Sequence, residues 1–416
     1  YSCGAASPAR GAILSDLSTD YVGLHLTNPI IVAPAAITET AERMKRCEDA
    51  GAAAVVVKTY FETEVSRRAP APRFEVIRYR SGRERAFTLY SYEQASIFDR
   101  DEYAEEIRRA KECLSIPVIA SINCVTDDEW VRATQACQQA GADALELNVS
   151  CPHGSHVMSD TDIATEMVRC LSLVKGTARI PIVPKMTPQL TSPVQTAQRL
   201  AHDGASAVVM FNRFTGLDVD VETALPRMHG SYAGHGGPWS IHYVLRWIAE
   251  TSPRLSIPIA ASGGVTTHED VVKLLLVGAQ VVETCTAVVM RGYQAITELV
   301  EGVQQYMDAH GYRALHELRG KTCGKILGLD EVDRSFRTIA RIDAERCIRC
   351  GTCYRVCIYD AVCEGDEYSV IPEACDGCGL CAVLCPASSI EMVPRPPGLP
   401  YPRKSVPTGW LKRAGP

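Results

Sequence analysis

Residues 142–154 read Ala-Asp-Ala-Leu-Glu-Leu-Asn-Val-Ser-Cys-Pro-His-Gly. The first part, 142–147, is an apolar, β-compatible run, and the chain then turns on Pro152 and Gly154. Cys151 therefore lies on a loop just past a strand end, where it can reach a substrate while the strand holds it in place. A free cysteine is often only a small buried residue. The polar context, with Asn148 and Ser150 just before the thiol, favours a functional role.

This stretch is one of eight similar units along the chain. Short apolar segments alternate with amphipathic segments from Pro29 onward. The expected strands are 30–33, 53–57, 117–122, 142–147, 180–184, 207–210, 257–260 and 281–283, and the helices between them include 39–49, 127–140, 192–203, 268–277 and 294–310. Eight parallel strands alternating with helices predict a TIM (β/α)8 barrel. An open doubly wound sheet is the alternative, disfavoured by the eight successive units and the missing nucleotide fingerprint.

Composition narrows the class of protein. The chain has 416 residues, 46% of them hydrophobic, and a net charge of −6, with no basic block before its last residues. This balance argues against a nucleic-acid partner. No apolar run approaches the ~20 residues of a membrane span, and the residues present show no signal peptide. We expect a soluble, cytoplasmic protein without a membrane partner.

The eighteen cysteines are unevenly placed, and half of them lie in 347–385. Two Cys-x-x-Cys-x-x-Cys-x-x-x-Cys runs stand there, and this spacing is typical of two [4Fe–4S] clusters in a ferredoxin-like domain. The fourth cysteine of each run crosses to the other cluster, so the expected ligand sets are Cys347, Cys350, Cys353 and Cys385 for one, and Cys375, Cys378, Cys381 and Cys357 for the other. Ile358 replaces the proline that usually follows the first run. Structural zinc is the weaker alternative.

The composition divides the chain into four parts. We expect a lead-in at 1–28 that is irregular or a hairpin, the barrel at 29–335, and the cluster domain at 336–393. Residues 394–416 form a proline-rich, basic tail without a core of its own.

Polar residues follow the expected strands, at the carboxyl end of the barrel where functional loops gather. They are Lys58, Asn123, Asn148, Cys151, Lys185, Asn212, Arg213, Gly263, Gly264, Thr284, Cys285 and Thr286. Gly263 and Gly264 let the backbone approach a ligand closely. With 284–286 they predict a phosphate site after strands seven and eight. One phosphate site without a pyrophosphate motif indicates FMN rather than FAD, with Lys58 and Lys185 facing the redox ring.

Two long segments interrupt the alternation. Residues 61–91 are rich in Arg and Pro, and residues 214–240 contain a glycine-dense stretch. Long loops in compact domains are usually functional or disordered, and we expect these two to form a lid and a substrate wall. Residues 155–162 are a candidate flap that carries the thiol.

The flavin barrel and the two-cluster tail together resemble the iron–sulfur, FMN-carrying subunit of NAD-dependent dihydropyrimidine dehydrogenases, and the barrel is similar to dihydroorotate dehydrogenases. The resemblance spans about 17–393. It is carried by 148–154, Lys58-Thr59, 184–188, 262–265 and the paired cysteine runs.

The resemblance implies roles for individual residues. Cys151 matches the general acid that protonates one alkene carbon while reduced FMN delivers hydride to the other. Asn148 and Asn212 match amides that hold the substrate ring. The expected FMN-binding residues are Ala35, Lys58, Thr59, Asn148, Lys185, Gly263, Gly264, Thr284, Cys285 and Thr286.

The chain departs from the family pattern at two places. Arg213 stands where the family usually has Thr, and the asparagine expected after the third strand has only Asn123, Thr126 or Asp127 as candidates. A guanidinium binds carboxylates or phosphates in a bidentate manner. The resemblance implies reduction of the C=C bond of a uracil- or thymine-type pyrimidine with electrons supplied through the two clusters. Arg213 leads to the alternative hypothesis of an anionic unsaturated substrate. The expected substrate contacts are Asn123, Thr126, Asn148, Asn212 and Arg213.

No G-x-G-x-x-G follows a strand, so a Rossmann-type nicotinamide site is not expected. The resemblance implies a partner subunit that carries FAD and binds NAD(P)H, in a dimer of heterodimers. Two alternatives stay open. One is a dihydroorotate-type dehydrogenase that passes electrons outward through the clusters, and the other is a subunit that only relays electrons.

Overall fold

The computed structural model describes residues 14–62, 72–81, 84–91, 96–149, 160–227, 232–333 and 337–400. The chain separates into two compact units, Tyr1–Ile326 and Leu327–Pro416. The boundaries of the four parts expected from the sequence stay predictions.

Eight parallel strands close into a ring in the first unit. In ring order they are β3 (Ile30–Val32), β4 (Ala54–Val56), β8 (Val118–Asn123), β9 (Ala144–Leu147), β10 (Ile182–Met186), β11 (Val208–Met210), β16 (Ile259–Ser262) and β17 (Val281–Thr284). The last strand pairs with the first, since Val282 is in register with Ile30. This closure confirms the predicted TIM barrel and excludes the open sheet.

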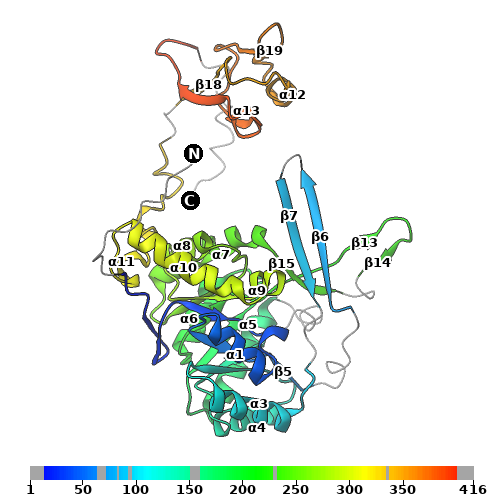
Figure 1. Ribbon diagram of the computed structural model, residues 1–416, viewed down its shortest axis with the longest axis vertical. Helices are drawn as coiled ribbons and strands as arrows, with labels where there is room; N and C mark the ends of the chain where they lie inside the picture. The colour runs from blue at the N-terminus through cyan, green and yellow to red at the C-terminus, as the bar shows by residue number, and fades with distance from the viewer. Residues whose placement is uncertain are drawn as a thin grey trace. The chain divides into compact units, whose positions relative to one another are not determined.

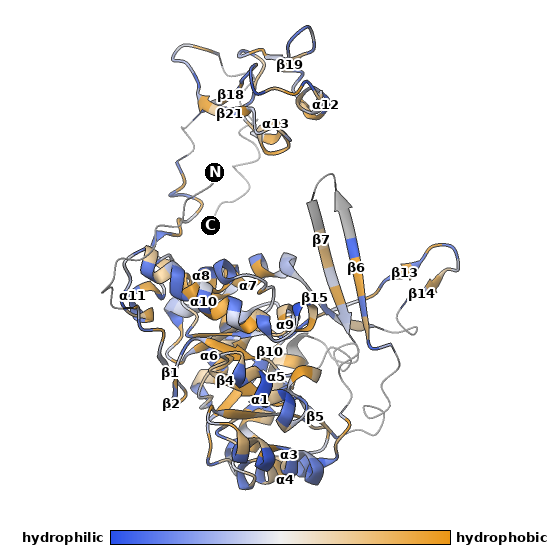
Figure 2. Cartoon of the chain, in the orientation of Figure 1, coloured by the Kyte–Doolittle hydropathy of each residue, from blue (hydrophilic) through white to orange (hydrophobic). Residues whose placement is uncertain are grey.

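Helices follow the strands and surround the ring. They are α1 (Ala41–Asp49), α3 (Arg100–Cys113), α4 (Asp127–Gln139), α5 (Asp160–Lys175), α6 (Pro193–His202), α7 (Ile241–Thr251), α8 (His268–Leu276) and α10 (Gln294–Ala309), with the shorter α9 (Thr286–Arg291) and α11 (Leu315–Leu318). Side chains fix several starts: Asp99 accepts from two backbone amides of α3 and forms a capping box with Glu102. Figure 2 shows the barrel strands as mainly apolar and much of α3 and α4 as hydrophilic.

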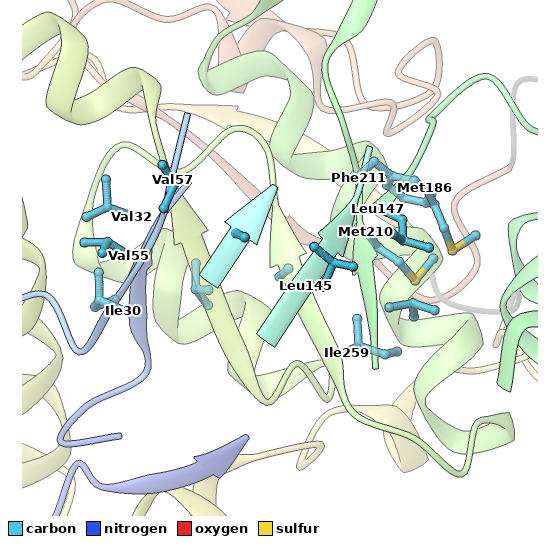
Figure 3. Packing of buried hydrophobic residues seen from close by; sticks show 14 of the residues in the cluster. Ile30, Val32, Val55, Val57, Leu145, Leu147, Met186, Met210, Phe211 and Ile259 are labelled. Carbon is cyan, nitrogen blue, oxygen red and sulfur yellow. The ribbon is translucent and has the colours of Figure 1, made fainter. Parts of the chain in front are cut away.

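Alternate residues of each strand enter two separate cores. Ile30 and Val32 belong to the large cluster between strands and helices, of which Figure 3 shows one part. Ile31, between them, belongs to a second cluster together with Val183 and Val281. Successive side chains of a strand point to opposite faces, so the second cluster fills the inside of the barrel.

A hairpin closes the amino-terminal end of the barrel. It consists of β1 (Thr19–Tyr21) and β2 (Leu24–Leu26), and Tyr21 and Leu26 join the interior cluster. The hairpin expected in the lead-in is therefore present in its described part, and residues 1–13 lie outside the described residues.

The two long segments are more regular than predicted. Strands β6 (Phe74–Ser81), β7 (Glu84–Ser91), β15 (Ala233–Gly236) and β12 (Phe214–Gly216) form a four-stranded antiparallel sheet, and β6 and β7 project from the barrel (Figure 1). A short hairpin follows, β13 (Val219–Asp220) with β14 (Leu225–Pro226). Neither 74–81 nor 84–91 shows a clear alternation of apolar and polar residues, so the usual sign of a hairpin is missing from the sequence.

Several strands also run further than predicted. Asn123, Lys185 and Thr284 were expected just after strands but lie inside β8, β10 and β17. Lys185 pairs in register with Val209, and Thr284 with Val32. A strand with a partner on each side continues its ladder past the end of its apolar run, because backbone pairing does not depend on the side chain.

The second unit has a small core. Strands β18 (Thr338–Ile342) and β21 (Ile390–Pro394) pair antiparallel. Strand β19 (Val362–Cys363) pairs in the same way with β20 (Ser369–Val370). In sequence, the short helix α12 (Thr352–Val356) precedes this second pair and α13 (Leu380–Val383) follows it. Four buried residues form its centre: Ile339, Ala340, Ala361 and Cys375. So small a core normally needs a metal centre for stability. Of the tail, residues 401–416 lie outside the described residues.

Among the described residues, no helix is both long and apolar enough to cross a membrane.

The hairpin that closes the barrel can be tested by truncating Leu26, whose exposed fraction is 0%. We expect Leu26→Ala to lower the free energy of unfolding by about 2–5 kcal/mol, because it leaves a cavity at the end of the interior core. The measurement is denaturant unfolding followed by far-UV circular dichroism. His25→Ala, at the neighbouring exposed position, is the control, and equal losses in the two variants would contradict the closing role.

Candidate active site

A pocket opens at the carboxyl ends of the barrel strands. Ten of the residues expected from the sequence line it: Lys58, Thr59, Asn148, Lys185, Asn212, Arg213, Gly263, Gly264, Cys285 and Thr286. They come from six different strand ends, which closure of the ring brings to one mouth. The antiparallel sheet adds Phe74, Leu89, Ser91, Phe214 and His235 as one wall.

The remaining expected residues lie elsewhere. Cys151 and most of the candidate flap at 155–162 fall outside the described residues. Thr126 does not line the pocket. Its hydroxyl donates to Glu62 Oε1 at 2.8 Å and accepts from the Glu129 amide at 3.2 Å, so it caps α4. Ala35 is fully buried beside the pocket as the residue before a 3-10 turn, Ala36–Thr38.

Asn148 is the centre of a chain of polar contacts. Its Nδ2 donates to Thr59 Oγ1 at 3.3 Å, and its Oδ1 accepts from Asn212 Nδ2 at 2.8 Å. Asn123 stands behind it and donates to its backbone carbonyl at 2.6 Å. Asn123 therefore does not line the pocket but fixes the backbone that carries Asn148. Thr59 also shares a hydrogen bond with Ser121, at 3.0 Å between the two hydroxyl oxygens.

Three charged side chains lie beneath this amide pair. Lys185 Nζ is 2.7 Å from Glu283 Oε2 and 3.4 Å from Glu146 Oε2. The residues Lys185, Glu146 and Glu283 have exposed fractions of 4%, 1% and 3%. Burial raises the pKa of Glu146 to about 8, and repulsion from Glu283 adds to the rise while Lys185 opposes it. Burial alone would lower the pKa of Lys185, but the two carboxylates outweigh it and the pKa lies above its usual value.

Neither glutamate was expected from the sequence, although a signal existed. Each interrupts a buried strand, in Ala-Leu-Glu-Leu (144–147) and Val-Val-Glu-Thr (281–284). Glutamate is almost never fully buried unless it is paired. An acidic residue in the middle of a fully buried strand is therefore a sign of a charge partner inside the barrel.

Arg213 lies against the wall of the pocket formed by the sheet. Its guanidinium donates to the hydroxyl of Ser91 and, at 3.4 Å, to the Ser91 carbonyl. It covers Gly234, where an added Cβ would be 2.9 Å from Arg213 Cζ. No carboxylate among the described residues forms an ion pair with Arg213 within 4.0 Å, so its charge is met only by neutral oxygens.

His235 lies next to Arg213 in an aromatic setting that the sequence did not predict. Its ring stacks on Tyr90 with centroids 4.7 Å apart, and Trp239 is 5.3 Å away. Nδ1 and the Thr88 hydroxyl are hydrogen-bonded at 3.0 Å. Burial lowers the pKa of His235, and the positive charge of Arg213 lowers it further. This wall presents one cation and a neutral ring.

The opposite end of the pocket suits a phosphate group. Gly263 and Gly264 have φ values of +112° and +79°, and a Cβ on Gly264 would lie 2.4 Å from the backbone nitrogen of Ile241. Only glycine fits there, so the backbone approaches the pocket closely. The buried Thr284 Oγ1 has no hydrogen-bond partner among the described residues. Thr284 itself does not line the pocket, whereas the backbone at Gly263 and Gly264 does and fits the phosphate of FMN.

In the second unit, the cysteines gather around two separate cavities. Cys347, Cys350, Cys353 and Cys385 line one, and Cys357, Cys375, Cys378 and Cys381 line the other. These are the two expected ligand sets. Within the described residues, no three Cys, His, Asp or Glu side chains are placed to hold a single metal ion. Four thiols spaced around a cavity suit a four-iron cluster better than one zinc ion, whose ligands lie ~2.3 Å from it.

Backbone amides also point at these sulfurs. Ala361 N and Ser389 N each lie 3.3 Å from a cysteine sulfur, of Cys357 and Cys385 respectively. Such hydrogen bonds stabilise thiolates and raise the reduction potential of a bound cluster.

Comparison with known proteins agrees with this geometry. A family model described as dihydroorotate dehydrogenase matches residues 16–307. The chain belongs to the dihydroorotate dehydrogenase family. Two models described as 4Fe-4S binding domains match 339–362 and 368–391. The barrel, the two iron–sulfur binding domains and the family resemblance stated from the sequence are thus confirmed, and the chain is an oxidoreductase of this family.

Curated relatives of the family cover different lengths of the chain. The NAD-dependent dihydropyrimidine dehydrogenase subunit PreA of Escherichia coli (strain K12) is 30% identical over 404 residues, 91% of this chain and 96% of the relative. The catalytic subunit of dihydroorotate dehydrogenase B (NAD(+)) of Thermoplasma acidophilum is 29% identical over 312 residues, 74% of this chain and 99% of the relative. The catalytic subunit of dihydroorotate dehydrogenase B (NAD(+)) of Pyrococcus furiosus is 28% identical over 311 residues, which are 73% of this chain and 98% of the relative.

The buried charges make barrel stability depend on pH. The pKa of Glu146 is about 8 in the folded chain against a usual value of 4.5. Between these values the folded chain binds more protons than the unfolded chain, so this group's contribution to stability is lost as pH rises from about 4.5 to 8. The ionisable groups facing Glu146 are Lys185, Glu283, Tyr21 and Tyr103.

We therefore expect wild type to lose stability relative to Glu146→Gln as the pH rises, by on the order of a few kcal/mol between pH 5 and pH 9. The measurement is the free energy of unfolding of both proteins in denaturant at each pH. A difference that does not change with pH would show that Glu146 keeps an ordinary pKa.

Proposed function

We propose that this chain is an FMN-dependent oxidoreductase that reduces an activated C=C bond with electrons supplied through two [4Fe–4S] clusters. The observation that carries the proposal is the single pocket lined by both the Asn148–Asn212 amide pair and the buried Lys185. Amides suit a polar, unsaturated substrate, and a buried ammonium suits a redox ring that gains negative charge.

The residues proposed to hold FMN lie on two sides of the pocket. Gly263, Gly264 and 284–286 would bind the phosphate, and Lys58, Thr59 and Lys185 would border the ring, with Ala35 behind them. Bound FMN would supply the hydride for alkene reduction. The relatives' names point to this chemistry, since they are dehydrogenases of dihydropyrimidine and of dihydroorotate.

The proposed substrate is an anionic unsaturated compound. Asn148 and Asn212 hold each other through one hydrogen bond, and their amide groups would exchange hydrogen bonds with polar edges of the substrate. Arg213, with no carboxylate partner among the described residues, supplies a charge for a substrate carboxylate. The neutral His235 beside it adds a stacking surface without a second charge.

Cys151 is the proposed proton donor. It follows Asn148 by three residues, so the amide that orients the substrate and the thiol that protonates it are carried by the same loop. A neutral thiol gives its proton to one alkene carbon as a hydride arrives at the other, and the resulting thiolate is reprotonated from water.

Electrons would reach the barrel from a partner subunit. The relative from Escherichia coli is named as a subunit, and we propose a partner that carries FAD and binds NAD(P)H, in a dimer of heterodimers. Thiolate-bound clusters need a reducing compartment, so we propose that the complex is cytoplasmic.

Two other functions use the same site. A dihydroorotate-type dehydrogenase would run the reaction toward oxidation, and Arg213 favours this candidate because it suits a carboxylate. Rates measured in both directions would separate the two. A pure electron relay would need neither the amide pair nor Arg213 in the pocket.

Arg213 provides the test of the substrate. The protein is reduced anaerobically and mixed in a stopped-flow instrument with uracil, thymine, orotate or other unsaturated carboxylates, while flavin absorbance is followed. We expect fast reoxidation by a carboxylate. In Arg213→Ala its apparent affinity should fall about 10–100-fold, the effect of a lost charge-assisted hydrogen bond.

Arg213→Lys is the matched variant, because it keeps the charge but loses the planar fork, and its loss should be smaller. Fast reoxidation by uracil in wild type, or an unchanged carboxylate affinity in Arg213→Ala, would contradict an anionic substrate.

Cys151 provides the test of the chemical step. We expect Cys151→Ala to lower turnover about 10²–10⁴-fold, the usual contribution of a general acid, while the FMN content of the purified protein stays at one per chain. Cys151→Ser should retain intermediate activity because a hydroxyl is a weaker acid. Turnover of Cys151→Ala within a few-fold of wild type would exclude the thiol as proton donor.

A further inference from the structure

The three charged groups beneath the pocket form an arrangement that alkene chemistry alone does not require. One ammonium, Lys185 Nζ, contacts Glu283 Oε2 at 2.7 Å and both carboxylate oxygens of Glu146 at 3.4 and 3.5 Å. Ser121 donates to Glu146 Oε1 at 3.1 Å. Two carboxyl groups therefore share a single cation in a place that water hardly reaches.

Their depths in the barrel differ. Lys185 and Glu283 line the pocket, whereas Glu146 does not. By strand alternation all three point inward, from β9, β10 and β17, which places them above the apolar interior that contains Val183 and Val281. The ammonium thus lies between the pocket on one side and the carboxyl groups on the other.

This placement is costly for the fold. Taking an ion from water into the interior costs several kcal/mol, and a buried ion pair often contributes less stability than apolar residues of the same size. A second carboxyl group adds repulsion that one lysine does not fully offset. The arrangement is therefore more readily explained by the charge that it presents to the pocket than by stability.

We propose that Glu146 and Glu283 are positioning residues that hold Lys185 and offset its positive charge, so that the pocket binds reduced FMN less tightly than a lone lysine would allow. The inference rests on the proposed FMN site. Reduced FMN carries more negative charge than oxidised FMN, so the net charge of the three groups sets the ratio of the two affinities and hence how readily the flavin is reduced. With both glutamates present that net charge is zero or negative. Without them it is positive.

The test is the ratio of dissociation constants for oxidised and reduced FMN, measured anaerobically by titrating flavin-free full-length chain with each form. We expect the double variant Glu146→Gln/Glu283→Gln to favour reduced FMN at least about tenfold more than wild type does, the effect of one unit charge within ~10 Å at an effective dielectric of about 20. Glu283→Gln alone should lie between the two. This readout does not depend on substrate or turnover.

Glu106→Gln is the control. Glu106 is also buried, with an exposed fraction of 6%, but it lies on α3 and accepts from the Ala41 amide, away from the pocket. The ratio of dissociation constants for oxidised and reduced FMN in Glu106→Gln should equal the ratio in wild type.

The possible results distinguish a failure of this inference from a failure of the proposed function on which it rests. If wild type binds neither form of FMN, the proposed function fails. If FMN binds but the ratio in the double variant stays within about twofold of wild type, the FMN site stands and the role of the two glutamates is wrong. Should the double variant not fold, Glu283→Gln decides by the same criterion, because it removes one of the two charges and keeps the shape of the side chain.

Discussion

Closure of the parallel ring is the constraint on which the rest of the structure depends. Once β17 pairs with β3, every second residue of eight strands must face an interior that has no route to solvent except at its ends. The β1–β2 hairpin closes the amino-terminal end with Tyr21 and Leu26. Any polar side chain pointing inward must then either find a partner inside the barrel or lie near the carboxyl-terminal mouth.

The interior residues follow that constraint along the barrel axis. Near the strand starts the inward side chains are apolar, as at Ile31 and Val183. Further along they become the mutually paired charges of Lys185 and the two glutamates, and at the mouth they become the amides of Asn148 and Asn212. Hydrogen bonds through Ser121 and Thr59 connect the charged layer to the amides. The buried charges and the amides therefore belong to one network of hydrogen bonds of 3.0–3.3 Å.

The sequence predicted the parts of this arrangement that local patterns encode. Period-two and helical patterns located the eight units, and the cysteine spacing separated the two cavities of the second unit as the structure has them. The misses have a common cause. Glu146 and Glu283 both contact Lys185 only because β9, β10 and β17 point side chains into the same barrel interior, and the two glutamates lie 137 positions apart in sequence. The sheet at 74–91 and 214–236 pairs strands that are likewise distant, so its residues looked like loops when each segment was considered alone.

The same non-local pairing explains how an arginine is accommodated in the pocket wall. In the antiparallel sheet Gly234 pairs with Thr215 on one side and with Ser91 on the other. Arg213, just before β12, folds back over Gly234 to reach Ser91. A Cβ at position 234 would lie 2.9 Å from Arg213 Cζ, so a larger residue there would push the guanidinium out of its present position. A small side chain at 213 would conversely leave Gly234 uncovered and open to water. A substitution at 213 therefore changes the shape of this wall as well as its charge.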